Sequence, residues 1–194
     1  MPPSTPPRRH DPPPHAGPLA RQVGRQTLEV LVIAAAALAV QQAWSAGALT
    51  AATVCVAVVT LAISKTGYFL VENLQHILLA TAQEIPYHRF LALMGVNMAQ
   101  ITLSFALDFW LLELADPGSF SGFDANAGAG RAFFDCFFYS VLNFSFFGFG
   151  DILPLTIPAK IVTLLEVVLA FFTVIFLLSD FISLKDSLRQ ERDC

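Results

Sequence analysis

The chain has 194 residues, of which 55% are hydrophobic and only 13% are charged, and its formal net charge is −4. Soluble domains carry about 25% charged residues, so too few charges remain here to cover a water-exposed surface. The negative net charge gives no basic surface for a nucleic acid, and three widely spaced cysteines indicate neither a disulfide framework nor a zinc site. The composition predicts an integral membrane protein.

Residues 1–26 hold eight prolines and no apolar periodicity, which predicts a disordered, proline-rich cytoplasmic tail. The next 39 residues, between Arg25 and Lys65, carry a single charge, Glu29. As one helix this stretch would be about 58 Å long at 1.5 Å per residue, twice the ~30 Å hydrocarbon core of a bilayer. We therefore predict a transmembrane hairpin over 27–64, with Trp44 and Gly47 near its turn.

Apolar and polar residues are mixed over 65–89, and Pro86 ends the helical pattern. This segment predicts a linker helix that either lies on the cytoplasmic interface or extends the second span. A simple connecting helix is an equally good interpretation.

The rest of the chain, 90–185, alternates between long and short apolar segments. An outer transmembrane helix is predicted over 90–114, and a glycine-rich loop covers 116–131. The 13 apolar residues 132–144 are too few to span and are typical of a re-entrant helix. An inner helix is predicted over 158–185, starting at Pro158, and 186–194 form a short cytoplasmic tail.

The placement of basic residues supports four spans with both termini in the cytoplasm. In that arrangement nine Lys and Arg residues face the inside, and only Arg131 and Lys160 face the outside, as the positive-inside rule requires. Lys65 is then a cytoplasmic-side charge, whereas Asp108 and Glu113 are solvated near the outer interface. We expect a multi-pass protein of the cell membrane, namely the bacterial cytoplasmic membrane.

The short helix is followed directly by Gly148-Phe149-Gly150-Asp151. Glycine adopts positive φ without a steric penalty, so alternate glycines allow successive carbonyls to face one side. Rings of carbonyls can replace the hydration shell of an ion, and the carbonyl end of a helix favours a cation. These features together predict a cation-binding loop, although the two glycines could also be ordinary turn residues.

The segment from Tyr139 to Thr156 resembles the pore helix and selectivity filter of tetrameric potassium channels, and the resemblance extends over 90–185. The residues that carry it are Tyr139, Ser140, Asn143, Ser145, Gly148, Phe149, Gly150 and Asp151. It implies an all-α homotetramer in a lipid bilayer, which conducts potassium passively and is not an enzyme. No cofactor is expected, because potassium is the permeant ligand.

The resemblance also implies residue roles. Potassium would bind the carbonyls of the filter 146–151, namely Phe146, Phe147, Gly148, Phe149 and Gly150. The filter would be supported by Tyr139, Asn143, Ser145, Asp151 and Glu166, although an intramembrane carboxylate such as Glu166 could equally be purely structural. The cavity and gate would be lined by one face of the inner helix, formed by Phe171, Val174, Leu178 and Ile182.

Five residues depart from the family pattern, among them Phe149, which replaces the commoner Tyr, and Phe138, which stands where many members have Trp. Phe146 stands where the family usually has Thr, Phe147 replaces a small β-branched residue, and Leu142 replaces a Glu found in some bacterial members. These changes keep two alternatives open, a non-selective cation channel of the same fold and a non-conducting scaffold or regulatory subunit. The gating stimulus is not predicted.

Overall fold

The computed structural model describes residues 31–32, 34–35, 37–47, 49–82, 87–123, 128–148 and 150–190, without the side chains of 76–82, 87–90, 93 and 179–190. The predicted proline-rich tail therefore lies outside the described residues. Helical residues between 31 and 45 precede the named elements. These are α2 (Ala51–Ala82), α3 (Tyr87–Ala115), β1 (Phe120–Ser121), α4 (Ala129–Phe144), β2 (Leu153–Pro154) and α5 (Ile157–Gln190).

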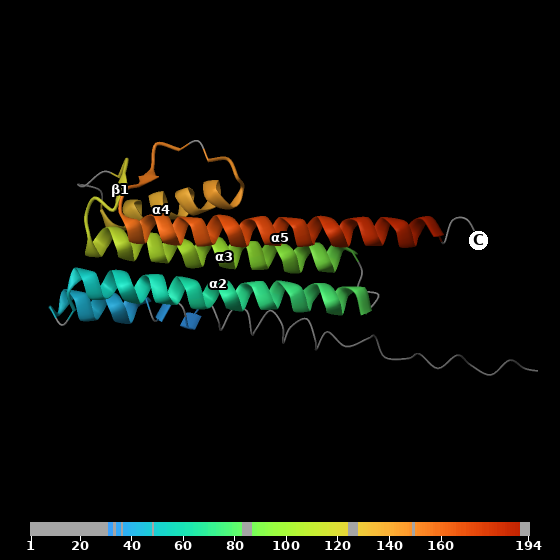
Figure 1. The fold of residues 1–194 in the computed structure, drawn as a ribbon, viewed down its shortest axis with the longest axis horizontal. Coiled ribbons are helices and arrows are strands. Elements are labelled where there is room, and N and C mark those ends of the chain that lie inside the picture. Colours follow the sequence, from blue (N-terminus) through green and yellow to red (C-terminus); the bar gives the residue numbers. More distant parts are fainter. Residues whose placement is uncertain are drawn as a thin grey trace, which may run out of the picture.

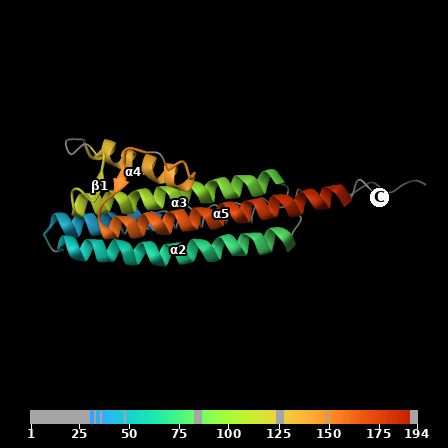
Figure 2. The ribbon, with the colours of Figure 1, turned by 45° about the horizontal axis from the view of Figure 1, so that its top comes forward.

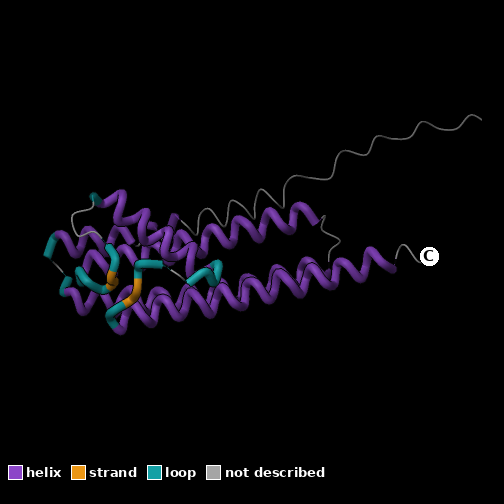
Figure 3. Tube along the Cα trace, turned by 90° about the horizontal axis from the view of Figure 1, so that it is seen from above, coloured by secondary structure: helices purple, strands orange, loops and turns teal. Residues whose placement is uncertain are grey.

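Three long helices, α2, α3 and α5, lie side by side along the length of the molecule (Figures 1 and 2). The short helix α4 and the two strands gather at one end, near the start of α5, as the view from above also shows (Figure 3). Among the described residues, three segments are long and apolar enough to cross a membrane: Ala51–Gln75, Met94–Ala115 and Ile157–Leu178. The chain is thus a multi-pass membrane protein, while the first half of the predicted hairpin falls partly outside the described residues.

The observed helices extend beyond several predicted boundaries. Helix α2 continues through residue 65 to Ala82, so the hairpin and the linker are not separate elements, and the linker extends the second span. Helix α4 begins at Ala129 rather than at 132, and α5 continues to Gln190 rather than to 185. The predicted helix ends were placed at charged residues and glycines. The observed helices run past these residues because their backbone hydrogen bonds continue.

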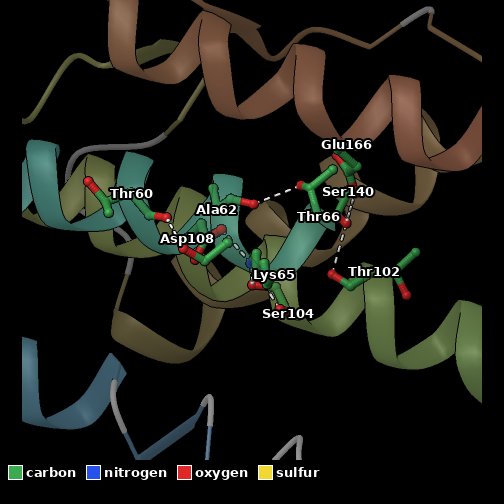
Figure 4. Close-up of polar contacts among 10 residues, drawn as sticks. Thr60, Ala62, Lys65, Thr66, Thr102, Ser104, Asp108, Ser140 and Glu166 are labelled. Atoms are coloured by element: carbon green, nitrogen blue, oxygen red, sulfur yellow. Dashed lines mark hydrogen bonds and ion pairs between the residues drawn. The ribbon is translucent and has the colours of Figure 1, made fainter. Parts of the chain in front are cut away.

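Lys65 and Asp108 form a buried ion pair between α2 and α3 (Figure 4). The Lys65 ammonium also donates to the backbone carbonyl of Ser104 at 2.8 Å and to its hydroxyl at 2.9 Å, and lies 4.2 Å from the centroid of the Phe105 ring. The predictions that Lys65 is a cytoplasmic-side charge and Asp108 is solvated are therefore wrong. Charges can be buried in a membrane when each satisfies the other.

Helix α3 lies at the centre of the fold. Within its membrane window 61% of residues are buried, compared with 33% for α2 and 28% for α5. Its side chains Ile101, Phe105, Phe109 and Leu112 are fully buried in the main apolar core. Helix α2 packs against both α3 and α5, and α4 packs against α3 and α5, so the N-terminal hairpin covers helices that belong to the predicted pore domain.

Candidate functional site

Helix α4 enters the structure from the end where α3 stops and α5 begins, and the chain after it returns to the same end (Figure 1). Its 16 residues give a length of about 24 Å at 1.5 Å per residue, less than the ~30 Å hydrocarbon core. A helix that stops at membrane depth is tolerated where protein or a water-filled cavity surrounds its end. Helix α4 is thus a re-entrant helix in its geometry.

The end of α4 is closed by two backbone hydrogen bonds. The amide of Phe147 donates to the carbonyl of Leu142 at 3.0 Å, and the amide of Phe146 donates to that of Asn143 at 3.1 Å. Phe146 has a φ of 57°. This combination is the Schellman motif, which usually places glycine at the left-handed position. Carbonyls of the last turn are therefore satisfied locally, and the loop after them remains to offer oxygens to an ion.

The loop itself contains a second left-handed residue, Gly148, with a φ of 55°. The prediction of positive φ at this glycine is confirmed. Phe149 lies outside the described residues, and Gly150 does not have positive φ. Gly150 instead approaches the α4 side chain of Leu142, since a Cβ added to Gly150 would lie 3.2 Å from Leu142 Cδ1.

Behind α4, the fully buried carboxyl of Glu166 contacts the Ser140 hydroxyl (Figure 4). The same carboxyl accepts a hydrogen bond from Asn143 Nδ2 at 3.2 Å. The Ser140 hydroxyl also lies 2.8 Å from the carbonyl oxygen of Thr102 on α3. The Ser140 hydroxyl therefore lies between the Glu166 carboxyl and the Thr102 carbonyl oxygen, within hydrogen-bonding reach of both. This cluster joins α4 to α3 and α5 behind the loop.

Tyr139, in the C-terminal half of α4, contacts three other elements. Its hydroxyl lies 3.2 Å from the Thr163 hydroxyl of α5. Its ring packs edge-on against Phe109 of α3, with centroids 5.0 Å apart, and against Phe120 of β1, with centroids 5.6 Å apart. Edge-to-face pairs of this kind add directional preference to apolar burial.

Of the predicted support residues, Tyr139 and Asn143 of α4 and Glu166 of α5 make contacts between helices behind the loop. The other two, Ser145 and Asp151, make no such contact among the described residues. The Ser145 hydroxyl bonds back to Leu142 O at 3.1 Å within its own helix end, and Asp151 is exposed. Of the predicted cavity residues, Phe171 and Leu178 are exposed on the single chain and Val174 is half-buried, while the Ile182 side chain lies outside the described residues. Their roles in conduction stay predictions.

Sequence reasoning missed the contacts between the loop before α4 and the segment after the filter. Strand β1 pairs with β2, and Gly122 lies against the backbone of Asp151. The glycine-rich composition of 116–131 marked a loop without distinguishing Gly122 from its neighbours. Within the residues that the structure describes, no group of three His, Cys, Asp or Glu side chains could hold a metal ion.

Two apolar helices that enclose a re-entrant helix and a returning carbonyl loop define the pore module of a membrane ion channel. Comparison with known proteins agrees: a family model described as "Ion channel" matches residues 91–185. The potassium channel protein kcv of Paramecium bursaria Chlorella virus 1 is 41% identical over 63 residues, which cover 31% of this chain and 67% of that protein. No solved structure matches the chain. The chain belongs to the potassium channel pore-domain family, and it is an ion channel, not an enzyme.

Proposed function

We propose that four copies of this chain form a potassium-selective channel with one pore on the fourfold axis. The filter would be the loop 146–151, with potassium held by its backbone carbonyls. The observation that carries the proposal is the left-handed backbone at Gly148, directly after a helix too short to cross the membrane. Such a backbone turns successive carbonyls toward one side, as ion coordination requires.

The burial of α5 supports self-association. Its membrane window has the highest mean hydropathy of the three, 2.8, yet only 28% of it is buried within the chain. By contrast, α3 has a mean hydropathy of 1.3 and is 61% buried. The most apolar helix therefore has much of its surface available for other copies of the chain, for a central cavity and for lipid.

Potassium is chosen as the ion because the chain is similar to a protein named as a potassium channel, the potassium channel protein kcv. A non-selective cation channel of the same fold is the second candidate. It is favoured by Phe146 and Phe147, whose rings are exposed at the start of the loop, at positions where the family usually has smaller side chains. Purified protein in liposomes separates the two, because reversal potentials in mixed potassium and sodium solutions measure selectivity directly.

Gly148→Ala tests the filter. At a φ of 55° an alanine costs about 1–2 kcal/mol per subunit, although no heavy atom lies closer than 3.9 Å to the added Cβ. We expect potassium flux to be lost while the oligomer, measured by size-exclusion chromatography with light scattering, remains. Gly47→Ala is the matched control, since Gly47 has a φ of 70° and open space around it in the hairpin turn.

Normal current from Gly148→Ala would contradict a carbonyl filter in this loop. Potassium current lost equally in Gly47→Ala would show that the effect is general backbone strain. An unmodified chain that forms tetramers but carries no flux would favour the non-conducting scaffold.

A further inference from the structure

A two-residue strand pair ties the loop before α4 to the segment after the filter. Strands β1 and β2 are antiparallel, with Phe120 opposite Pro154 and Ser121 opposite Leu153. The amide of Leu155 donates to the carbonyl of Ser119 at 2.8 Å, which extends the contact by one residue. The exit from the filter is thus held by backbone hydrogen bonds to a segment 32 residues earlier in the chain.

Gly122 makes the closest approach in this contact. Its φ is +88°, and a Cβ added there would lie 2.9 Å from the carbonyl carbon of Asp151, closer still to the carbonyl oxygen, and 3.3 Å from Ile152 Cα. All three atoms are backbone, so no side-chain rotation relieves the collision. Glycine is required at this position both for its conformation and for the space that it leaves.

The strand pair is anchored in the rigid part of the fold. The Phe120 ring is buried and packs edge-on against Phe109 of α3, with centroids 5.5 Å apart. The carboxylate of Glu113, at the end of α3, accepts hydrogen bonds from the amide of Gly118 at 3.0 Å and the amide of Phe120 at 3.1 Å. Movement of β1 relative to α3 would break these contacts.

We propose that Gly122 and the β1–β2 pair form a brace that fixes the outer end of the ion filter and so determines how long the channel stays conducting. On the side facing α4, the end of the filter at Gly150 contacts the Leu142 side chain, which is an apolar contact without directional bonding. On the outer side, it is held by the brace. Gly122 is therefore a positioning residue for conduction, and this inference rests on the proposed function of the loop 146–151.

The physical consequence is a dependence on ion occupancy. Bound cations hold carbonyls in place, because each ion attracts the oxygens around it. When the brace is weakened, the outer carbonyls are held mainly by the ions, so conduction should fail when external potassium is low and recover when it is high. A purely structural defect, such as a loss of assembled protein, would lower the current equally at both concentrations.

The experiment compares Gly122→Ala with Gly118→Ala in the full chain, reconstituted in planar bilayers. Both glycines lie in the same loop and are left-handed, with φ of +88° and +97°, but a Cβ at Gly118 meets no atom within 4 Å. We expect sustained current in Gly122→Ala to fall about tenfold at low external potassium, which corresponds to about 1.4 kcal/mol, and to recover at high potassium. Gly118→Ala carries the same kind of left-handed strain without the collision, and its amide can still donate to Glu113, so it should keep the potassium dependence of the unmodified chain.

A cross-link tests the same brace if Gly122→Ala does not assemble. Ser121→Cys combined with Leu153→Cys places thiols on directly opposed residues, at a spacing that a disulfide accepts. The oxidised protein should keep its current at low potassium longer than the reduced protein, and equal decay in the two states would overturn the proposal.

The failure of the brace and the failure of the proposed function are distinguishable. An unmodified chain that carries no potassium current overturns both. A conducting chain in which Gly122→Ala and Gly118→Ala show the same potassium dependence overturns the brace alone, and leaves the filter to the test at Gly148.

Discussion

Phe146 is the residue whose backbone conformation fits its amino-acid type least well. It is the only non-glycine residue with positive φ among those described, and left-handed backbone costs an L-residue about 1–2 kcal/mol. Two hydrogen bonds, from its own amide and from that of Phe147, hold it in the Schellman motif. Strain of this kind concentrates at functional sites when surrounding contacts determine the conformation, and here the site is the entrance to the proposed filter.

This strain predicts opposite effects for two substitutions at Phe146. Phe146→Gly should raise the free energy of unfolding by up to about 1 kcal/mol per subunit, because glycine relieves the left-handed strain but gains entropy in the unfolded chain. Phe146→Thr should lower it, because β-branched residues are genuine outliers at positive φ. Thermal unfolding followed by circular dichroism in detergent measures both. If threonine were as stable as glycine there, Phe146 would not be left-handed in the assembled channel.

At the residue scale, the sequence predicted what depends on local conformation and missed what depends on distant partners. Positive φ at Gly148 follows from the filter pattern alone. The pairing of Lys65 with Asp108 does not, because the two residues are 43 positions apart and each, taken by itself, resembles a solvated interfacial charge. Gly122 could not be singled out either, because the reason for a glycine there is the backbone of Asp151, almost 30 residues later.

At the scale of elements, α2 is joined to both pore helices by buried polar side chains. Asn73 of α2 donates through Nδ2 to the Thr173 hydroxyl of α5 at 2.8 Å, and its Oδ1 accepts from Asn97 of α3. All three residues are buried. Because apolar surfaces gain little from leaving lipid, such hydrogen bonds supply both affinity and register between helices in a membrane.

Thr173→Val tests this connection. Valine keeps the shape but removes the hydroxyl, so the Asn73 amide loses its partner. We expect the free energy of unfolding to fall by about 1 kcal/mol per subunit, measured by thermal unfolding in detergent. Thr60→Val is the matched control, since the exposed Thr60 hydroxyl also donates to the carbonyl four residues earlier, at 2.8 Å, and has no partner on another helix among the described residues.

Equal losses in the two variants would show that only the bond within the helix matters. A further loss when Asn73→Leu is added to Thr173→Val would indicate that Asn73 stabilises the fold through Asn97 as well, because the double variant would then remove two contacts rather than one.

The same connection explains why the sequence could not decide between an interfacial linker helix and an extension of the second span, of which the structure shows the second. The Lys65 charge suggested a membrane boundary, and the polar residues beyond it, Glu72 and Asn73 among them, suggested an interfacial helix. These side chains are buried in the structure. Alternation of polar and apolar residues does not distinguish a helix on a membrane surface from one that faces polar partners inside a bundle. The type and order of the pore elements were nevertheless predictable, because their lengths and glycine signals are local.

At the scale of the whole molecule, the exposed surface of α5 is the part of the chain that would meet lipid, a central cavity or other copies of the chain. Five of its exposed large residues recur at spacings of four, three, four and three, which is one helical face: Leu164, Val168, Phe171, Ile175 and Leu178. Phe171 and Leu178 belong to the cavity face predicted from sequence. Val174 is half-buried, and its neighbour Ile175 is 41% exposed, so the observed face favours Ile175 at that turn.

This face predicts a hydrophobic gate. In a tetramer, four copies of Leu178 would surround the inner part of the pore, where an apolar constriction closes by losing its water. Leu178→Asn should wet that constriction and raise resting conductance, by about tenfold for each 1.4 kcal/mol removed from the barrier. Leu74→Asn is the control, because Leu74 is a similarly exposed leucine on α2. Single-channel recording without a stimulus measures the effect.

Ile175→Asn should also increase leak more than Val174→Asn, since only the former lies on the exposed face. Resting current that is unchanged or lower in Leu178→Asn would place the gate elsewhere, and a larger effect at Val174 would restore the face predicted from sequence.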